Sequence, residues 1–139
     1  MSGNEAAAIG SLRAVTSAEA SYSAAAGQGG NAVLLAVLSK GCGAVGTPGF
    51  ISADLATDPS IKSGYTVTLA AGAGAAAGPN DCNGTVTNIG YYATAVPVSL
   101  NNSGSRAFAT DAGGAIWQNT AGLAPTQPFA VAAGISTIQ

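Results

Sequence analysis

The stretch Asn4–Tyr22, NEAAAIGSLRAVTSAEASY, decides the fold of this chain. Its many alanines favour a helix, and Asn4 is a good N-cap residue. Apolar residues recur at three- and four-residue spacing, which is typical of the buried face of a helix. The residues that we expect on this core-facing side are Ile9, Leu12, Val15 and Tyr22. A glycine-rich run over 27–30 ends the pattern, so the sequence predicts a helix over residues 4–26.

A loop-rich region is expected next, over residues 27–63. Within it, residues 31–40 are predicted to form a second, short helix with Asn31 as its N-cap. The dipeptides Pro48-Gly49 and Asp58-Pro59 are turn signals. We therefore expect this region to connect the long helix to the strands that follow.

Strands are expected over residues 64–118. Tyr65–Leu69 alternates in the period of a half-buried strand. Residues 86–96 contain a second strand, residues 106–118 form a hairpin, and the tail 119–139 shows no clear period. A helix followed by consecutive strands indicates an α+β fold. We expect one domain, in which a long N-terminal helix packs on a sheet of three to four antiparallel strands.

Charge is scarce in this chain. Only 7% of the 139 residues are charged, against roughly 25% in an ordinary soluble protein. Such a surface suits packing against copies of itself, because few charges lose their water there, and it equally suits a neutral extracellular surface. The four basic residues are scattered, so we expect no nucleic-acid partner. The apolar run Ala32–Leu38 is far shorter than the ~20 residues of a membrane-spanning helix, so no such span is expected here.

Catalytic chemistry finds little support. The chain has no histidine, which excludes Ser-His-Asp and Cys-His nucleophile systems. Its six carboxylates are spread through the chain, mostly at expected caps and turns. A weak calcium candidate is Asp81 with Asn80 and Asn83, or Asp111 with nearby carbonyls. We therefore expect no enzyme and no cofactor, and no metal beyond that weak candidate.

Cys42 and Cys82 are the two cysteines. They do not form a CxxC pair, and no histidine completes a zinc set. In a chain with few charges and many Gly, Thr and Asn residues, they suggest an oxidising compartment and one disulfide, with two buried free thiols as the alternative. The bond would close a loop of about 40 residues and contribute roughly 4 kcal/mol in the chain-entropy model.

Arg13 and Glu19 are charged residues of the predicted helix. Glu19 lies among small residues, and a solvent-facing charge is the simpler interpretation. The alternative is a subunit interface, in which Glu19 binds a cation of a neighbouring subunit such as Arg13.

The first helix resembles a known segment. Residues 4–13, followed by Thr16, Glu19 and Tyr22, are similar to the part of bacterial type IV pilins and related pseudopilins that follows the membrane half of their first helix. Supporting similarity to the first-strand entry and closing hairpin of that group lies at residues 49–52, 61–69, 106–111 and 114–116. The resemblance covers most of the chain as far as Trp117, and its first block is the most specific.

The resemblance implies a pilin-like fold and a structural role. Members of the family form homo-oligomeric helical filaments, together with other pilins or pseudopilins, and perform no covalent chemistry. It also implies a leader and an apolar half-helix ahead of this sequence, with inner-membrane anchoring before assembly into an extracellular pilus or in the periplasm. The implied function is a type IV pilus subunit for adhesion, motility or DNA uptake.

Two alternatives stay open. A pseudopilin of a type II secretion system would share the fold and form a short periplasmic filament. A ligand-binding or adhesin module would instead use the loops around residues 72–83.

Overall fold

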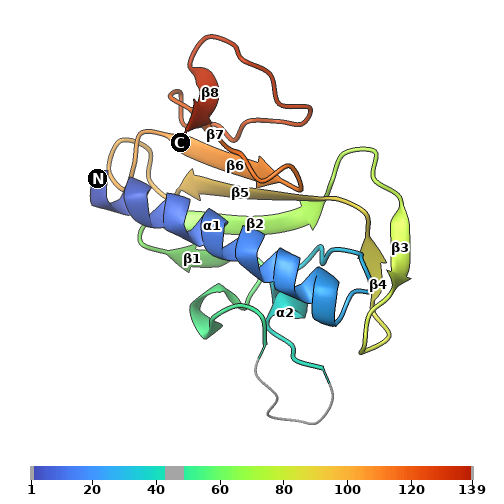
Figure 1. Cartoon of the computed structure of the whole chain (residues 1–139). Helices are drawn as coiled ribbons and strands as arrows, with labels where there is room; N and C mark the ends of the chain where they lie inside the picture. The colour runs from blue at the N-terminus through green and yellow to red at the C-terminus, as the bar shows by residue number, and fades with distance from the viewer. Residues whose placement is uncertain (1, 43–48, 139) are drawn as a thin grey trace.

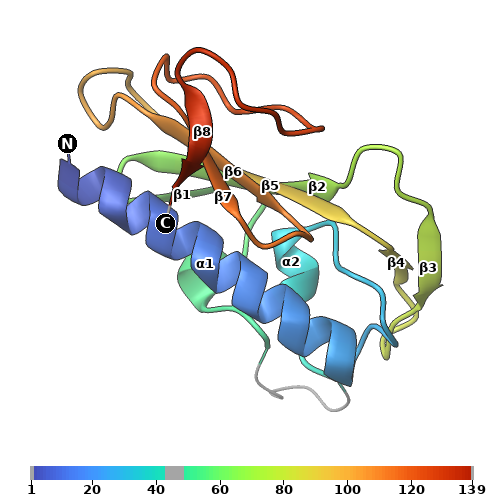
Figure 2. The same ribbon diagram turned by 45° about the horizontal axis from the view of Figure 1, so that its top comes forward.

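A long helix crosses one face of an antiparallel sheet in the computed structural model of this chain (Figure 1). The structure describes residues 2–42 and 49–138. The helix, α1, covers Ser2–Ala25, close to the predicted range 4–26. The view turned by 45° shows the helix and the sheet as two layers (Figure 2).

Eight strands are assigned within the described residues. In chain order they are β1 (Ser60–Lys62), β2 (Tyr65–Ala71), β3 (Ala77–Asn80), β4 (Val86–Asn88), β5 (Tyr91–Pro97), β6 (Ala107–Asp111), β7 (Ile116–Asn119) and β8 (Ile135–Ile138). Six of them form the main antiparallel sheet in the order β1-β2-β5-β6-β7-β8, and β3 pairs with β4 in a separate small sheet. The β3–β4 hairpin is therefore an insertion between the neighbouring strands β2 and β5 (Figure 1).

The predicted fold class is wrong. The sequence predicts an α+β fold with a pilin-like helix on three to four strands, whereas the described chain is mostly β, with six strands in the main sheet and two in the small one. β1 has three residues and β8 has four, which is too short for a clear two-residue period. Each is a strand because it pairs along an edge of the sheet, β1 with β2, which follows it after two residues, and β8 with β7.

The core lies between α1 and the inner face of the main sheet, where α1 packs on β2, β5 and β6. Strand alternation places Tyr65, Val67 and Leu69 of β2 on this face. The register aligns Val67 with Ala95 of β5, and Ala95 with Phe108 of β6. All five side chains are buried. The small Ala95 at the centre of the sheet leaves room for the helix above it.

The segment after β7 covers part of the outer face of the sheet. The Phe129 ring stacks on Trp117 of β7 with centroids 5.5 Å apart, and its centroid lies 6.1 Å from that of Tyr92 of β5. The Tyr92 hydroxyl donates to the carbonyl of Pro125. β8 then returns to pair with β7 (Figure 2). The tail predicted to be irregular is thus held by ring contacts and by a strand.

Two short helical pieces lie between α1 and β1. They are α2 (Leu35–Leu38), which is shorter than the predicted 31–40, and the 3-10 turn η1 (Ala53–Leu55). The turn expected at Pro48-Gly49 lies partly outside the described residues.

The N-cap predicted for α2 is wrong. Asn31 pairs through its backbone with Asn88 of β4. Asp58 supplies the cap from a distance, because its carboxylate accepts hydrogen bonds from the Leu35 N–H at 2.7 Å and the Ala36 N–H at 3.0 Å. The predicted turn residue Asp58 therefore joins the two ends of the loop region.

Candidate functional site

The inward side of α1 is fixed to the sheet. Leu12, Val15 and Tyr22, three of the predicted core-facing residues, are at most 1% exposed. Ile9, the fourth, is half-buried and packs against the core. Because one side of the helix is held along its length, the opposite side is presented outward.

The outward side of α1 consists of small residues and one charge. Its exposed members are Gly3, Ala6, Gly10, Arg13, Ala14, Ser17, Ala20, Ser21, Ala24 and Ala25. Arg13 is the charged member of this set. Small side chains allow another chain to approach the helix backbone closely.

A groove runs along one flank of α1. Two adjoining hollows of about 540 and 590 Å³ share Thr16 and Ala20 in their lining. The lining includes Arg13, Thr16, Glu19 and Ala20 of α1, Tyr91 of β5 and Ile138 of β8, and we call this feature the α1 groove. Arg13 lines the first hollow and Glu19 the second, so the two predicted interface charges lie at different ends of the same groove.

Glu19 is not the solvent-facing charge that the sequence suggests. The residue is 1% exposed. Its Oε1 accepts a hydrogen bond from the Ala32 N–H at 2.8 Å, because the chain turns back beside α1 after the helix ends. Its Oε2 is buried and has no hydrogen-bond partner among the described residues. One of the two carboxyl oxygens of Glu19 is therefore buried without a hydrogen-bond partner among the described residues.

Burial raises the pKa of the Glu19 carboxyl to about 8 from its ordinary value of 4.5, and the Ala32 N–H opposes this only in part. The carboxyl is therefore mostly protonated at neutral pH. Burial also raises the pKa of Tyr22 and of Tyr91, and a negative charge on Glu19 contributes to both shifts. These two hydroxyls are the titratable neighbours that face Glu19.

A second polar contact fastens the C-terminal half of α1. The Tyr22 hydroxyl donates to Asp81 Oδ2 at 2.7 Å, and the Tyr22 ring meets Phe50 edge-on with centroids 5.7 Å apart. Asp81 Oδ1 accepts hydrogen bonds from the N–H groups of Asn83 and Thr85, both at 2.8 Å. Burial alone would raise the pKa of Asp81, but these hydrogen bonds outweigh it and lower the pKa. Both oxygens of this calcium candidate are therefore used within the chain.

The other calcium candidate, Asp111, is also engaged. It accepts hydrogen bonds from the Gly113 N–H at 2.9 Å and from Gln127 Nε2 at 3.0 Å. Over residues 2–42 and 49–138, no three His, Cys, Asp or Glu side chains gather in a way that would hold a metal ion. In the same ranges, no helix combines the length and the hydropathy needed to cross a bilayer.

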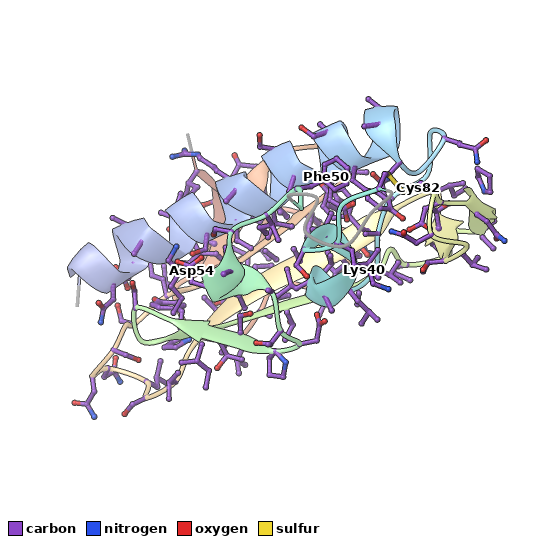
Figure 3. The ribbon with its side chains drawn as sticks, turned by 90° about the horizontal axis from the view of Figure 1, so that it is seen from below. Lys40, Phe50, Asp54 and Cys82 are labelled. Atoms are coloured by element: carbon purple, nitrogen blue, oxygen red, sulfur yellow. A yellow bond between two sulfur atoms is a disulfide. The ribbon has the colours of Figure 1, made fainter. Side chains whose placement is uncertain are left out.

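A disulfide joins Cys42 and Cys82, whose Cα atoms lie 5.7 Å apart. The Cys82 N–H also donates to the carbonyl of Ala26, just beyond α1, at 3.0 Å. Figure 3 shows Cys82 and Phe50 next to the C-terminal half of the helix, and Lys40 close to α2. The bond therefore fastens the loop region and the β3–β4 insertion to the same end of α1.

The N-terminal end of α1 is held by an ion pair that sequence reasoning missed. Glu5 is 7% exposed, and its Oε1 lies 3.3 Å from the Arg106 guanidinium. Its Oε2 accepts hydrogen bonds from the N–H groups of Ser105 and Arg106, both at 3.0 Å. Arg106 also lies over the Phe108 ring, 5.1 Å from its centroid. No local signal connects residues 100 positions apart.

The electrostatics of Glu5 differ from those of Glu19. Burial alone would raise the pKa of Glu5, but the hydrogen bonds from Ser105 and Arg106 and the charge of Arg106 together lower it. Glu5 is therefore ionised and fully partnered at neutral pH. Only the groove end of the helix contains a buried carboxyl with an oxygen that lacks a partner, within the described residues.

No family model, curated protein or solved structure matches this chain. The resemblance to type IV pilins therefore stays a prediction.

Proposed function

We propose that this chain is a structural subunit of an extracellular filament of the type IV pilus kind, which assembles through its N-terminal helix. The observation that carries the proposal is the two-sided character of α1. Its inward side is locked to the sheet, and its outward side presents small residues with one charge over 24 residues of helix. Such a face suits close packing against helices of neighbouring copies.

The low charge of the whole chain supports the same proposal. A subunit of a filament buries surface on several sides, and each unpaired charge in such an interface would have to lose its water. Because only 7% of its residues are charged, burying the surface of this chain costs little free energy of desolvation. Two of its four cations, Arg106 and Lys62, already form ion pairs within the chain.

Both ends of α1 are tied to the rest of the domain, by the Glu5–Arg106 pair at one end and by the Tyr22–Asp81 hydrogen bond, with the Cys82 N–H bonded to the Ala26 carbonyl, at the other. A helix fixed in this way can transmit load from one subunit to the next without separating from its own sheet. In the proposal, an apolar helical segment ahead of α1 anchors the subunit in the inner membrane before assembly, and the final location is an extracellular pilus.

Immunogold electron microscopy tests the proposal. Antibodies raised against this chain are applied to native cells, and cells with the gene deleted serve as the control. We expect gold along surface filaments that disappear, or lose the label, in the deletion strain. Label that never coincides with filaments in cells that contain the chain would contradict the proposal.

A further inference from the structure

The turn between β3 and β4 contains an acceptor motif for N-linked glycosylation. Residues 83–85 read Asn83-Gly84-Thr85, which fits the pattern Asn-X-Ser/Thr with X other than proline. The β3–β4 hairpin stands beside the main sheet, at the C-terminal end of α1 (Figure 1). Asn83 and Gly84 are exposed, and a Cβ atom added at Gly84 would meet no described residue within 4 Å apart from its chain neighbours. The motif therefore lies where a bulky group can be attached without displacing the chain.

The turn does not depend on the Asn83 side chain. Asp81 holds the turn, because its Oδ1 accepts the N–H groups of Asn83 and Thr85, and its carbonyl accepts the Gly84 N–H at 3.0 Å. Gly84 has a φ of +80°, which glycine adopts without strain. The Asn83 Nδ2 donates a long hydrogen bond, at 3.3 Å, to the Gly41 carbonyl on the exposed surface. The structure of the turn thus accounts for Asp81 and Gly84, but it gives the Asn83 amide little to do.

A second match to the motif, over residues 101–103, is built differently. The Ser103 hydroxyl donates to the Ser99 carbonyl at 3.1 Å and accepts the Ser99 N–H at 3.0 Å. The Thr85 hydroxyl, by contrast, forms no hydrogen bond to the residues that the structure describes. The motif requires a hydroxyl at its third position, and a hydroxyl that is already bound within the chain is less accessible to an enzyme. The geometry therefore favours Asn83 over the second match.

We propose that Asn83 is an acceptor for an N-linked glycan. The donor is an oligosaccharide whose anomeric carbon is joined to a lipid pyrophosphate, and an oligosaccharyltransferase catalyses the transfer. The Asn83 Nδ2 forms a bond to the anomeric carbon, and the bond from that carbon to the phosphate oxygen breaks. The electron pair leaves with the lipid pyrophosphate, and one amide proton passes to the solvent. The Asn amide starts with two hydrogens, so the one that remains can keep the hydrogen bond to Gly41.

The character of the whole chain agrees with a secreted glycoprotein. The Cys42–Cys82 disulfide is typical of an oxidising compartment, and the Asn-X-Ser/Thr motif is used in secreted proteins. A glycan is bulky and solubilising, so it adds hydration to a surface on which only 7% of the residues are charged. This inference goes beyond the proposed function, because an exported chain of any role could carry such a glycan.

Mass spectrometry of the chain purified from its native cells tests the site. Peptides that contain residue 83 are fragmented by electron transfer, which leaves a glycan attached to its own residue. We expect the mass of a sugar chain on Asn83, and its loss in the variants Asn83→Gln and Thr85→Val. Thr85→Ser is the matched control, because it keeps the hydroxyl and should keep the glycan. Asn83 is exposed, so Asn83→Gln keeps the test valid even if Thr85→Val folds poorly.

Two results would overturn the proposal. One is a residue 83 peptide from native cells that carries no sugar, and the other is sugar confined to residues 101–103 or to Ser and Thr side chains. Filaments that contain this chain without a glycan would refute the site and leave the proposed function standing. A chain that is glycosylated at Asn83 but is never found in filaments would do the reverse.

Discussion

The two glutamates of α1 are both buried, yet they end in opposite states of ionisation. Glu5, at the N-terminal end, has a guanidinium, two backbone N–H groups and a hydroxyl around it, so its pKa is lowered. Glu19, four turns further along, has one N–H group for its two oxygens, so burial dominates and its pKa rises to about 8. Burial alone does not decide the charge of a carboxyl; the number of donors around it does.

The Glu5 carboxylate has hydrogen-bond partners for both oxygens within the chain, whereas Glu19 Oε2 has none among the described residues. The Glu5 end of the helix is complete within the chain and holds the helix start to the β5–β6 connection. The Glu19 end of the helix lines a groove, and this end is attached to the rest of the domain by Tyr22 with Asp81 and by the Cys82 N–H with the Ala26 carbonyl. The two glutamates of one helix therefore differ in how far the chain itself supplies their hydrogen-bond partners.

Removal of the Cys42–Cys82 disulfide, which lies near the C-terminal end of α1, should have the largest effect on the free energy of unfolding. Replacing both Cys42 and Cys82 by Ser is expected to lower the free energy of unfolding by about 4 kcal/mol, because the unfolded chain regains the freedom of a loop that spans 40 residues. Urea denaturation of oxidised wild-type chain and the double variant measures this. A loss below about 1 kcal/mol would show that this end of the helix is held without the bond.

The raised pKa of Glu19 predicts that the stability of the chain falls as the pH rises. Its folded pKa is raised, so its contribution to stability is fully present below the ordinary value of 4.5 and is lost as pH rises toward and through about 8. The loss should amount to several kcal/mol, and no histidine titrates in the same range. Denaturation at a series of pH values should show this decline in wild-type chain and a much flatter profile in Glu19→Gln. Equal slopes in the two proteins would contradict the assignment.

Replacement of Arg106, at the N-terminal end of α1, should have a smaller effect on the free energy of unfolding. Arg106→Gln leaves Glu5 buried without its cation, so we expect the free energy of unfolding to fall by about 2 kcal/mol. Lys62→Gln is the matched control, because it breaks an exposed pair with Asp54 and should change stability little. Thermal or urea denaturation of both variants at neutral pH compares them. Similar losses in the two variants would mean that the Glu5–Arg106 pair has no special role.

Local features of the sequence predict the helix and its inward side, because alanine content and three- to four-residue spacing act within one element. Leu12, Val15 and Tyr22 lie inward for that reason. The number of strands could not be predicted, because β1 and β8 are too short to show a two-residue period and are strands through their pairing at the edges of the sheet. Glu19 was misassigned for the same kind of reason, since the residues that bury it, among them Ala32 and Tyr91, come from other elements.

The pKa of the Glu19 carboxyl, followed by ¹³C NMR in a dilute sample of the chain, tests most directly the claim that the number of donors around each buried glutamate of α1 decides its charge. A carboxyl that the fold buries with a single N–H donor should titrate near 8, because burial disfavours its charged form. A pKa near 4.5 in the dilute chain would show that Glu19 is neither buried nor incomplete.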